Sequence, residues 1–332
     1  MIRYLFSGIV WLFSLSVSAQ HYRMHPDVPV DSSFTVANEY KKHIKKHPLI
    51  KVVDMGDTSG LMIHRNITYA TLGERELHCD VFYPKTSVKK KRFPVVLIVH
   101  GGGWRSGDKE MDHPMAFELA RRGYATICVE YRLSMEALYP AAIIDIKTAL
   151  RWVRASADDF PFDTRRIAIQ GTSAGGQMAA LVGAINGYYP GFQSSIYRRY
   201  SDRVAAVVNI DGVLAFIHPE SGEGKDTPGK PSAATLWFGK PVAQDTLTRM
   251  EASALTHVHK HSAPSIFINS SIPRFHGGRD DMIAKMKQWG IETRVYEHVD
   301  CMHTFWLFHP WFDETVNQID SFLVETMKIR KR

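Results

Sequence analysis

Residues 166–181 read RIAIQGTSAGGQMAAL and give the strongest indication of the fold. An apolar run typical of a buried strand ends at Gln170, and an alanine-rich helical pattern begins at Ala174. Small residues, mostly glycine, flank Ser173 and permit a turn sharp enough to hold this serine in a strained conformation above the sheet. The start of the helix favours negative charge beside the hydroxyl. The pattern predicts a strand, a sharp turn and a helix that present Ser173 as a nucleophile.

A glycine-rich loop upstream strengthens this interpretation over its alternative, a serine that merely caps an ordinary strand-to-helix turn. The buried strand pattern of residues 93–99 ends in His100-Gly101-Gly102-Gly103-Trp104. Loops of this kind expose backbone N–H groups that can face the oxyanion formed during acyl transfer. The two motifs together indicate ester or amide chemistry at Ser173.

Strand and helix patterns alternate along the chain. Apolar runs predict strands at residues 93–99, 124–131, 165–170, 204–210, 264–269 and 292–298. Helical patterns lie near residues 112–122, 140–156, 174–186, 279–289 and 311–328. This alternation predicts an α/β protein whose mostly parallel sheet is covered by helices on both faces. The 332 residues contain no internal repeat and suit a single domain with a large core.

Residues 1–19 have the features of a signal peptide. Arg3 precedes an apolar stretch at residues 4–17, and small residues up to Ala19 offer a cleavage site. The apolar stretch is shorter than the about 20 residues that span a bilayer. We expect export to the periplasm or the exterior, no stable membrane anchor after cleavage, and a catalytic domain at residues 20–332. An uncleaved anchor is the alternative.

The sequence gives no sign of a metal, a cofactor or a nucleic acid. Its three cysteines are far apart and lack metal-ligand spacing. The series His257, His259 and His261 is interpreted as a polar loop or helix end, because no carboxylate or cysteine pattern accompanies it. No nucleic-acid-binding motif is present, and the lysine-rich run at residues 41–46 is interpreted as a solvated helix face. We therefore expect no cofactor and no nucleic-acid partner.

The two glycine motifs, HGGGW at 100–104 and GTSAGG at 171–176, are separated by Glu130-Tyr131-Arg132-Leu133-Ser134 and Tyr139-Pro140-Ala141-Ala142. This combination resembles the α/β-hydrolase esterases of the hormone-sensitive-lipase and bacterial acetyl-xylan or feruloyl esterase type, over nearly the whole mature chain. The resemblance implies an eight-stranded α/β-hydrolase fold, with a possible small cap insertion at about 212–262. It also implies an oxyanion hole formed by the amides of Gly102, Gly103 and Ala174.

His303 is the candidate base of the triad. It lies in a short loop between the predicted strand at 292–298 and the last predicted helix, where the esterases that this chain resembles carry their histidine. His100 is expected to support the glycine loop instead, and His298 lies within a strand.

The acidic residue of the triad is not where those esterases usually have it. They usually place an aspartate just after the strand that corresponds to residues 264–269 of this chain. The residues that follow, 270–274, contain no carboxylate. Asp211 ends the preceding predicted strand, a rigid position on the same rim as the histidine loop, and its surroundings are similar to those in plasma-type platelet-activating-factor acetylhydrolases. Asp280, at the start of a predicted helix where acidic residues are common, is the alternative. We prefer Asp211; either residue preserves the order Ser, Asp, His.

Substrate identity is the least determined feature. The chain has a net charge of +7, which would attract an exported protein to anionic polymers. Candidate substrate-binding residues are Arg105, Arg274, Arg279, Trp104 and Trp306, although solvation or core packing would explain each of them. We expect a polysaccharide or small ester substrate, with acetyl or methyl esters of pectin or xylan preferred. Alternatives are an exported serine peptidase, a general small-ester or lipid esterase, and a non-catalytic binding protein on a hydrolase fold.

Overall fold

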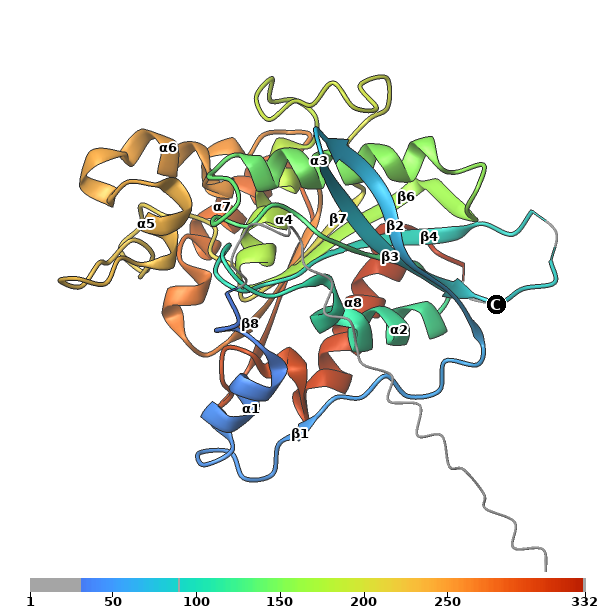
Figure 1. The fold of residues 1–332 in the computed structure, drawn as a ribbon, viewed down its shortest axis with the longest axis horizontal. Helices are drawn as coiled ribbons and strands as arrows, with labels where there is room; N and C mark the ends of the chain where they lie inside the picture. Colours follow the sequence, from blue (N-terminus) through green and yellow to red (C-terminus); the bar gives the residue numbers. More distant parts are fainter. Residues whose placement is uncertain (1–30, 89, 331–332) are drawn as a thin grey trace, which may run out of the picture.

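A computed structural model describes residues 31–88 and 90–330 (Figure 1). The predicted signal peptide at residues 1–19 lies outside the described residues. None of the helices in the described ranges is long and apolar enough to cross a membrane.

A central eight-stranded sheet organises the molecule. Its strands are β2 (Leu61–Leu72), β3 (Arg75–Pro84), β4 (Phe93–Val99), β5 (Ala125–Val129), β6 (Phe162–Thr172), β7 (Ala206–Ile210), β8 (Ser265–Ser270) and β9 (Thr293–His298). The spatial order is β2-β3-β5-β4-β6-β7-β8-β9. The β2–β3 and β3–β5 pairs are antiparallel and the others parallel. The predicted fold class, a mostly parallel eight-stranded sheet, is confirmed.

Helices cover both faces of this sheet. They are α1 (Val36–His43), α2 (His113–Arg121), α3 (Ala141–Ala155), α4 (Ala174–Ile185), α5 (Ala233–Phe238), α6 (Thr246–Glu251), α7 (Arg279–Gln288) and α8 (Trp311–Thr326). In Figure 1, α3 lies on one side of β4, and α2 and α8 lie on the other.

The sequence of β4 explains this two-sided burial. Successive side chains of a strand point to opposite faces of the sheet. Accordingly, Val95 and Leu97 pack in the core that includes α3 and α4, whereas Val96 and Ile98 pack in the core that includes α2 and α8. A strand that is apolar at every position therefore has to lie between two layers of helices.

The antiparallel strands β2 and β3 were not among the predicted strands. β2 is an edge strand whose middle carries exposed or partly exposed polar side chains, so it lacks the continuous apolar run that marks the central strands. A small second sheet pairs β1 (Lys51–Val52) with β10 (Phe308–His309). The three cysteines are buried and free.

Residues 212–262, the predicted cap insertion, contribute no strand to the central sheet. They form α5, α6 and two 3-10 turns, at Val242–Gln244 and Ala254–His257. Figure 1 shows α5 and α6 together at one end of the molecule. Their side chains join the core below the glycine loop, because Trp237 of α5 stacks on Trp104 at a centroid distance of 4.9 Å.

Close packing at the start of α4 gives a test of the fold. A Cβ atom on Gly175 would lie 2.1 Å from the backbone oxygen of Val99, at the end of β4. Because no side-chain rotation can relieve a clash with backbone, we expect Gly175→Ala to lower the free energy of unfolding by about 3 kcal/mol or more. Urea unfolding followed by tryptophan fluorescence measures this change.

Gly60→Ala is the matched control, since a Cβ there would have no neighbour within 4 Å. We expect it to change the free energy of unfolding by less than about 0.5 kcal/mol. Equal stability of the two variants would contradict the packing described here.

Candidate active site

Ser173 occupies the sharp turn between β6 and α4. Its backbone has φ 52° and ψ −120°, a region that costs a non-glycine residue about 1–3 kcal/mol. The amide of Ser173 donates to the carbonyl of Ile210 at the end of β7 at 2.8 Å, which fixes the turn to the neighbouring strand. The side chain is thereby held at the carboxyl edge of the sheet, at the N-terminus of α4.

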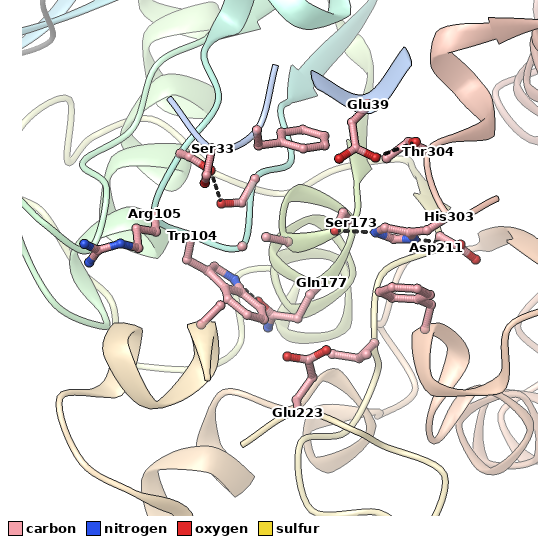
Figure 2. A pocket seen from close by; sticks show the side chains of 18 of the residues that line it. Ser33, Glu39, Trp104, Arg105, Ser173, Gln177, Asp211, Glu223, His303 and Thr304 are labelled. Carbon is pink, nitrogen blue, oxygen red and sulfur yellow. Dashed lines mark hydrogen bonds and ion pairs between the residues drawn. The ribbon is translucent and has the colours of Figure 1, made fainter. Parts of the chain in front are cut away.

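A continuous chain of hydrogen bonds joins Ser173, His303 and Asp211. The Oγ of Ser173 lies 2.8 Å from His303 Nε2, and His303 Nδ1 lies 2.8 Å from Asp211 Oδ2. Figure 2 shows the three side chains in line. They come from the β6–α4 turn, the loop after β9 and the end of β7, so parallel strands bring them to one rim of the sheet.

The carboxylate of Asp211 is buried and well supplied with donors. Its side chain accepts hydrogen bonds from the Ser270 amide at 2.8 Å, the Ser270 hydroxyl at 2.5 Å and the Asn269 side-chain amide at 3.2 Å. Charge-assisted hydrogen bonds of this kind stabilise the ionised form of a buried acid. The end of β8, where the sequence lacks a carboxylate, therefore supplies donors to the acid on β7.

Asp280, the alternative acid, lies elsewhere. It is in the first turn of α7, where its exposed carboxylate pairs with Arg279 Nε at 2.8 Å. No contact joins it to His303 in the described part of the chain. The structure therefore places Asp211, and not Asp280, beside the histidine.

Two aromatic rings contact the imidazole of His303. Phe275 stacks on its imidazole with ring centroids 3.4 Å apart, and Trp306 meets it edge-on at 5.3 Å. Trp306, a candidate substrate-binding residue, is buried in the core that includes α2 and α8 and is not among the residues that line the cavity. Its contact positions the imidazole.

The glycine loop faces Ser173 with free amides. Gly102 and Gly103 have φ of 119° and 59°, and both line the same cavity as Ser173 and Ala174. Among the described residues, the amides of Gly102 and Gly103 donate to no protein acceptor. A Cβ on Gly102 would lie 2.0 Å from the Ser106 carbonyl oxygen, so only glycine fits. These amides remain available to an oxyanion.

His100 supports this loop, as the sequence suggested. Its buried ring stacks on Tyr131 at a centroid distance of 4.4 Å, and its Nδ1 lies 2.7 Å from the Gly101 carbonyl oxygen. Burial lowers the pKa of His100, which favours the neutral ring. A neutral donor at Nδ1 would hold the loop without adding charge beside the cavity.

A cavity of about 330 Å³ opens beside Ser173. The N-terminal segment forms one wall, which the sequence did not predict: Ser33, Phe34, Glu39 and Lys42 all line it. The buried Glu39 of α1 accepts a hydrogen bond from the Thr304 hydroxyl at 3.0 Å, next to His303. Figure 2 shows this contact on the side of the cavity away from Glu223. Lys42 is largely exposed, in agreement with the predicted solvated face, and it also lines the mouth of the cavity and pairs with Glu39.

Three of the five candidate substrate-binding residues line the cavity and two do not. Arg105, Arg274 and Trp104 line the cavity. Arg105 already pairs with Asp31 at 2.7 Å, and Arg274 lies over the Phe275 ring at 4.3 Å. Trp104 donates to the Gln177 side-chain oxygen at 3.0 Å, and so forms part of the cavity floor.

Arg279, the remaining candidate, is not among the residues that line the cavity. Its largely buried guanidinium binds Asp280 and the side-chain oxygen of Asn269 at 3.1 Å. Asn269 in turn donates to Asp211. Arg279 therefore contacts Asp211 indirectly, by fixing the position of the Asn269 side chain.

Within the described ranges, no group of three or more His, Cys, Asp or Glu side chains is arranged to hold a metal ion. His257 and His259 bind the backbone carbonyl oxygens of Glu251 and Ile185, at 2.6 and 3.1 Å. His261 stacks on Tyr188. His257 and His259 thus join the segment after α6 to the ends of α6 and α4.

The chain was compared with protein families and with individual known proteins. Residues 79–288 match the family described as BD-FAE. Esterase LipC of Mycobacterium tuberculosis is 30% identical over 199 residues, which are 58% of this chain and 46% of LipC. The probable carboxylic ester hydrolase LipM of the same organism is 29% identical over 231 residues, which are 69% of this chain and 51% of LipM. The chain thus spans about half the length of these curated relatives.

Solved structures share the fold. A truncated carbohydrate esterase from gut microbiota has a TM-score of 0.70 at 21% identity, over 83% of this chain and 100% of the other. Apo Thermogutta terrifontis esterase 2 has a TM-score of 0.67 at 20% identity, over 83% and 98%. The match to residues 79–288 covers well over half of the chain, which therefore belongs to the BD-FAE family.

Proposed function

We propose that this chain is a serine hydrolase of carboxylic esters. The observation that carries the proposal is the hydrogen-bonded series Ser173–His303–Asp211 beside a cavity lined with free backbone amides. The family match and the esterase names of the curated relatives support ester chemistry.

The geometry supports an acyl-enzyme mechanism. His303 Nε2 takes the proton from the Ser173 hydroxyl, whose oxygen attacks the ester carbonyl carbon. Asp211 holds the imidazole in position and stabilises its cationic form. The oxyanion accepts hydrogen bonds from the amides of Gly102, Gly103 and Ala174. His303 then gives its proton to the leaving alcohol, and water, activated by the same imidazole, hydrolyses the acyl enzyme.

We propose that the protein is exported and that its substrate is a carbohydrate ester, an acetyl or methyl ester of a plant polysaccharide such as xylan or pectin. The signal-like residues 1–19 support export. Two solved structures of similar fold are described as a carbohydrate esterase and as a bifunctional GH43-CE protein of Bacteroides eggerthii. The walls of the cavity combine apolar surface with charged side chains such as Arg274 and Glu223, which could bind the polar groups of a sugar ester.

Loss of the nucleophile is the first test. We expect Ser173→Ala to lower kcat for a small aryl acetate by about 10⁴-fold or more, since the acyl enzyme can no longer form. A fluorophosphonate probe should label the unmodified protein at Ser173, as mass spectrometry of the labelled peptide would show. A folded protein that neither turns over the ester nor takes up the probe would instead be a binding protein on a hydrolase fold.

The acid is tested by two isosteric changes. We expect Asp211→Asn to lower kcat by about 10³- to 10⁴-fold, because the amide no longer stabilises the imidazolium form of His303. Asp280→Asn is the matched control and should stay within about twofold of the unmodified protein, since its carboxylate is exposed on α7. Near-complete activity in Asp211→Asn would overturn the assignment.

The substrate class is tested by measuring acetate and methanol released together from acetylated, methylated pectin and from acetylated xylan. We expect release that disappears in Ser173→Ala. Methanol would indicate a methylesterase and acetate a deacetylase. Hydrolysis of a small aryl ester without either product would exclude the polysaccharide substrate and retain the esterase.

A further inference from the structure

Glu223 stands out because its carboxylate faces the cavity without a partner. The residue lies in the loop between β7 and α5 and lines the same cavity as Ser173. Figure 2 shows its side chain beneath Gln177, on the side of the cavity away from Glu39. Among the described residues, no donor binds its carboxylate oxygens, and no Lys or Arg nitrogen comes within 4.0 Å.

The loop holds Glu223 in a defined place. Its backbone amide donates to the hydroxyl of the buried Ser221 at 3.3 Å. Ser221 is itself packed tightly, because a Cβ on Gly277 would lie 3.0 Å from its backbone. The carboxylate is therefore presented by an ordered backbone and not by a free surface side chain.

Glu223 is partly buried at the wall of the cavity. Burial raises the pKa of its carboxyl group above the usual value, although Arg274 and His303 act in the opposite direction. A carboxylate can accept about four hydrogen bonds. The oxygens of Glu223 have no donor among the described residues, so a ligand that brings hydroxyl donors to them gains hydrogen bonds.

A second hollow adjoins the first at this residue. It measures about 340 Å³, and Glu223 lines both it and the cavity beside Ser173. Ile217, Lys225 and Val242 also line this second hollow. Each space falls within the usual range for small ligands of about 300–1,000 Å³. A chain of linked units bound at Ser173 would pass over Glu223 into the second hollow.

The charges around the cavity argue against an anionic ligand at this point. Asp31 pairs with Arg105, and Asp280 pairs with Arg279 away from the cavity. An anionic sugar would thus meet the unpaired carboxylate of Glu223 with only Arg274 nearby to offset it. A cationic ligand would be repelled by Arg274, whereas Arg105 and Lys42 are already paired with Asp31 and Glu39. An uncharged ligand rich in hydroxyl donors fits both constraints.

We infer that Glu223 determines specificity by accepting hydrogen bonds from the hydroxyl groups of an uncharged sugar next to the ester, and by disfavouring anionic sugars. The inference rests on the proposed esterase function and narrows its substrate to esters on neutral polysaccharide chains. It assigns Glu223 to substrate recognition, separate from the proton transfers of His303.

The test compares Glu223→Ala and Glu223→Gln on three substrates: acetylated xylo-oligosaccharides, acetylated oligogalacturonides and 4-nitrophenyl acetate. We expect the ratio of kcat/KM for the neutral oligosaccharide to that for the aryl ester to fall by about ten- to a hundredfold in Glu223→Ala. Glu223→Gln should fall less, because the amide oxygen still accepts. The preference for the neutral over the anionic oligosaccharide should shrink in both variants.

Glu220→Ala is the matched control, since this carboxylate lies in the same loop but outside the cavity wall. It should leave all three ratios unchanged. An equal loss of activity on sugar and aryl esters in Glu223→Ala would indicate a structural role and overturn the inference. Unchanged ratios would overturn it as well.

A binding measurement tests the role of Glu223 independently of the proposed esterase activity. Calorimetry with deacetylated xylo-oligosaccharides compares Ser173→Ala with the double variant Ser173→Ala, Glu223→Ala, and needs no turnover. Weaker binding in the double variant supports Glu223 as a sugar ligand even if the unmodified protein hydrolyses none of the esters, an outcome that would remove the esterase proposal alone. Equal binding, or no binding to Ser173→Ala, overturns the inference.

Discussion

The buried carboxylate of Asp211 is the constraint on which the rest of the site depends. It accepts hydrogen bonds from the end of β8 through Ser270 and lies 2.8 Å from the imidazole of His303. A buried charge is tolerated only where such donors surround it. The ends of β7 and β8 and the loop after β9 must therefore keep one relative arrangement. The parallel sheet supplies that arrangement, since it brings all three to the same edge.

Most of the fold could be predicted because its central strands are buried on both faces. β4 is apolar at every position, and the predicted limits of residues 93–99 agree with the structure. β2 could not be found in the same way, because it lies at the sheet edge with polar side chains toward solvent. The pattern of apolar residues predicts a strand well where every side chain is buried, and poorly where many side chains face solvent.

The site was predictable to the extent that local geometry fixes it. The turn at Ser173 and the loop at Gly102 need particular small residues, and such needs are visible in the sequence. Contacts between segments that are far apart in the chain have no comparable signature in the sequence. Thr304 and Glu39 are 265 residues apart, and nothing in the lysine-rich run around Glu39 indicates a wall of the cavity. The catalytic roles of Ser173, His303 and Asp211 stay predictions.

The arginines show why charge is harder to interpret than apolar pattern. A guanidinium near the glycine loop or the acid could serve a ligand or a neighbouring carboxylate, and the sequence does not say which. In the structure, Arg105 pairs with Asp31, and Arg279 braces Asn269 behind Asp211. Glu223 is the opposite case, because it lines the same cavity as Ser173 and forms no ion pair with any described residue, although Arg274 lies close enough to act on its pKa. Glu223 and Arg274 both line the cavity without an ion pair among the described residues, so hydroxyl groups, which can donate to one and accept from the other, suit this part of the wall.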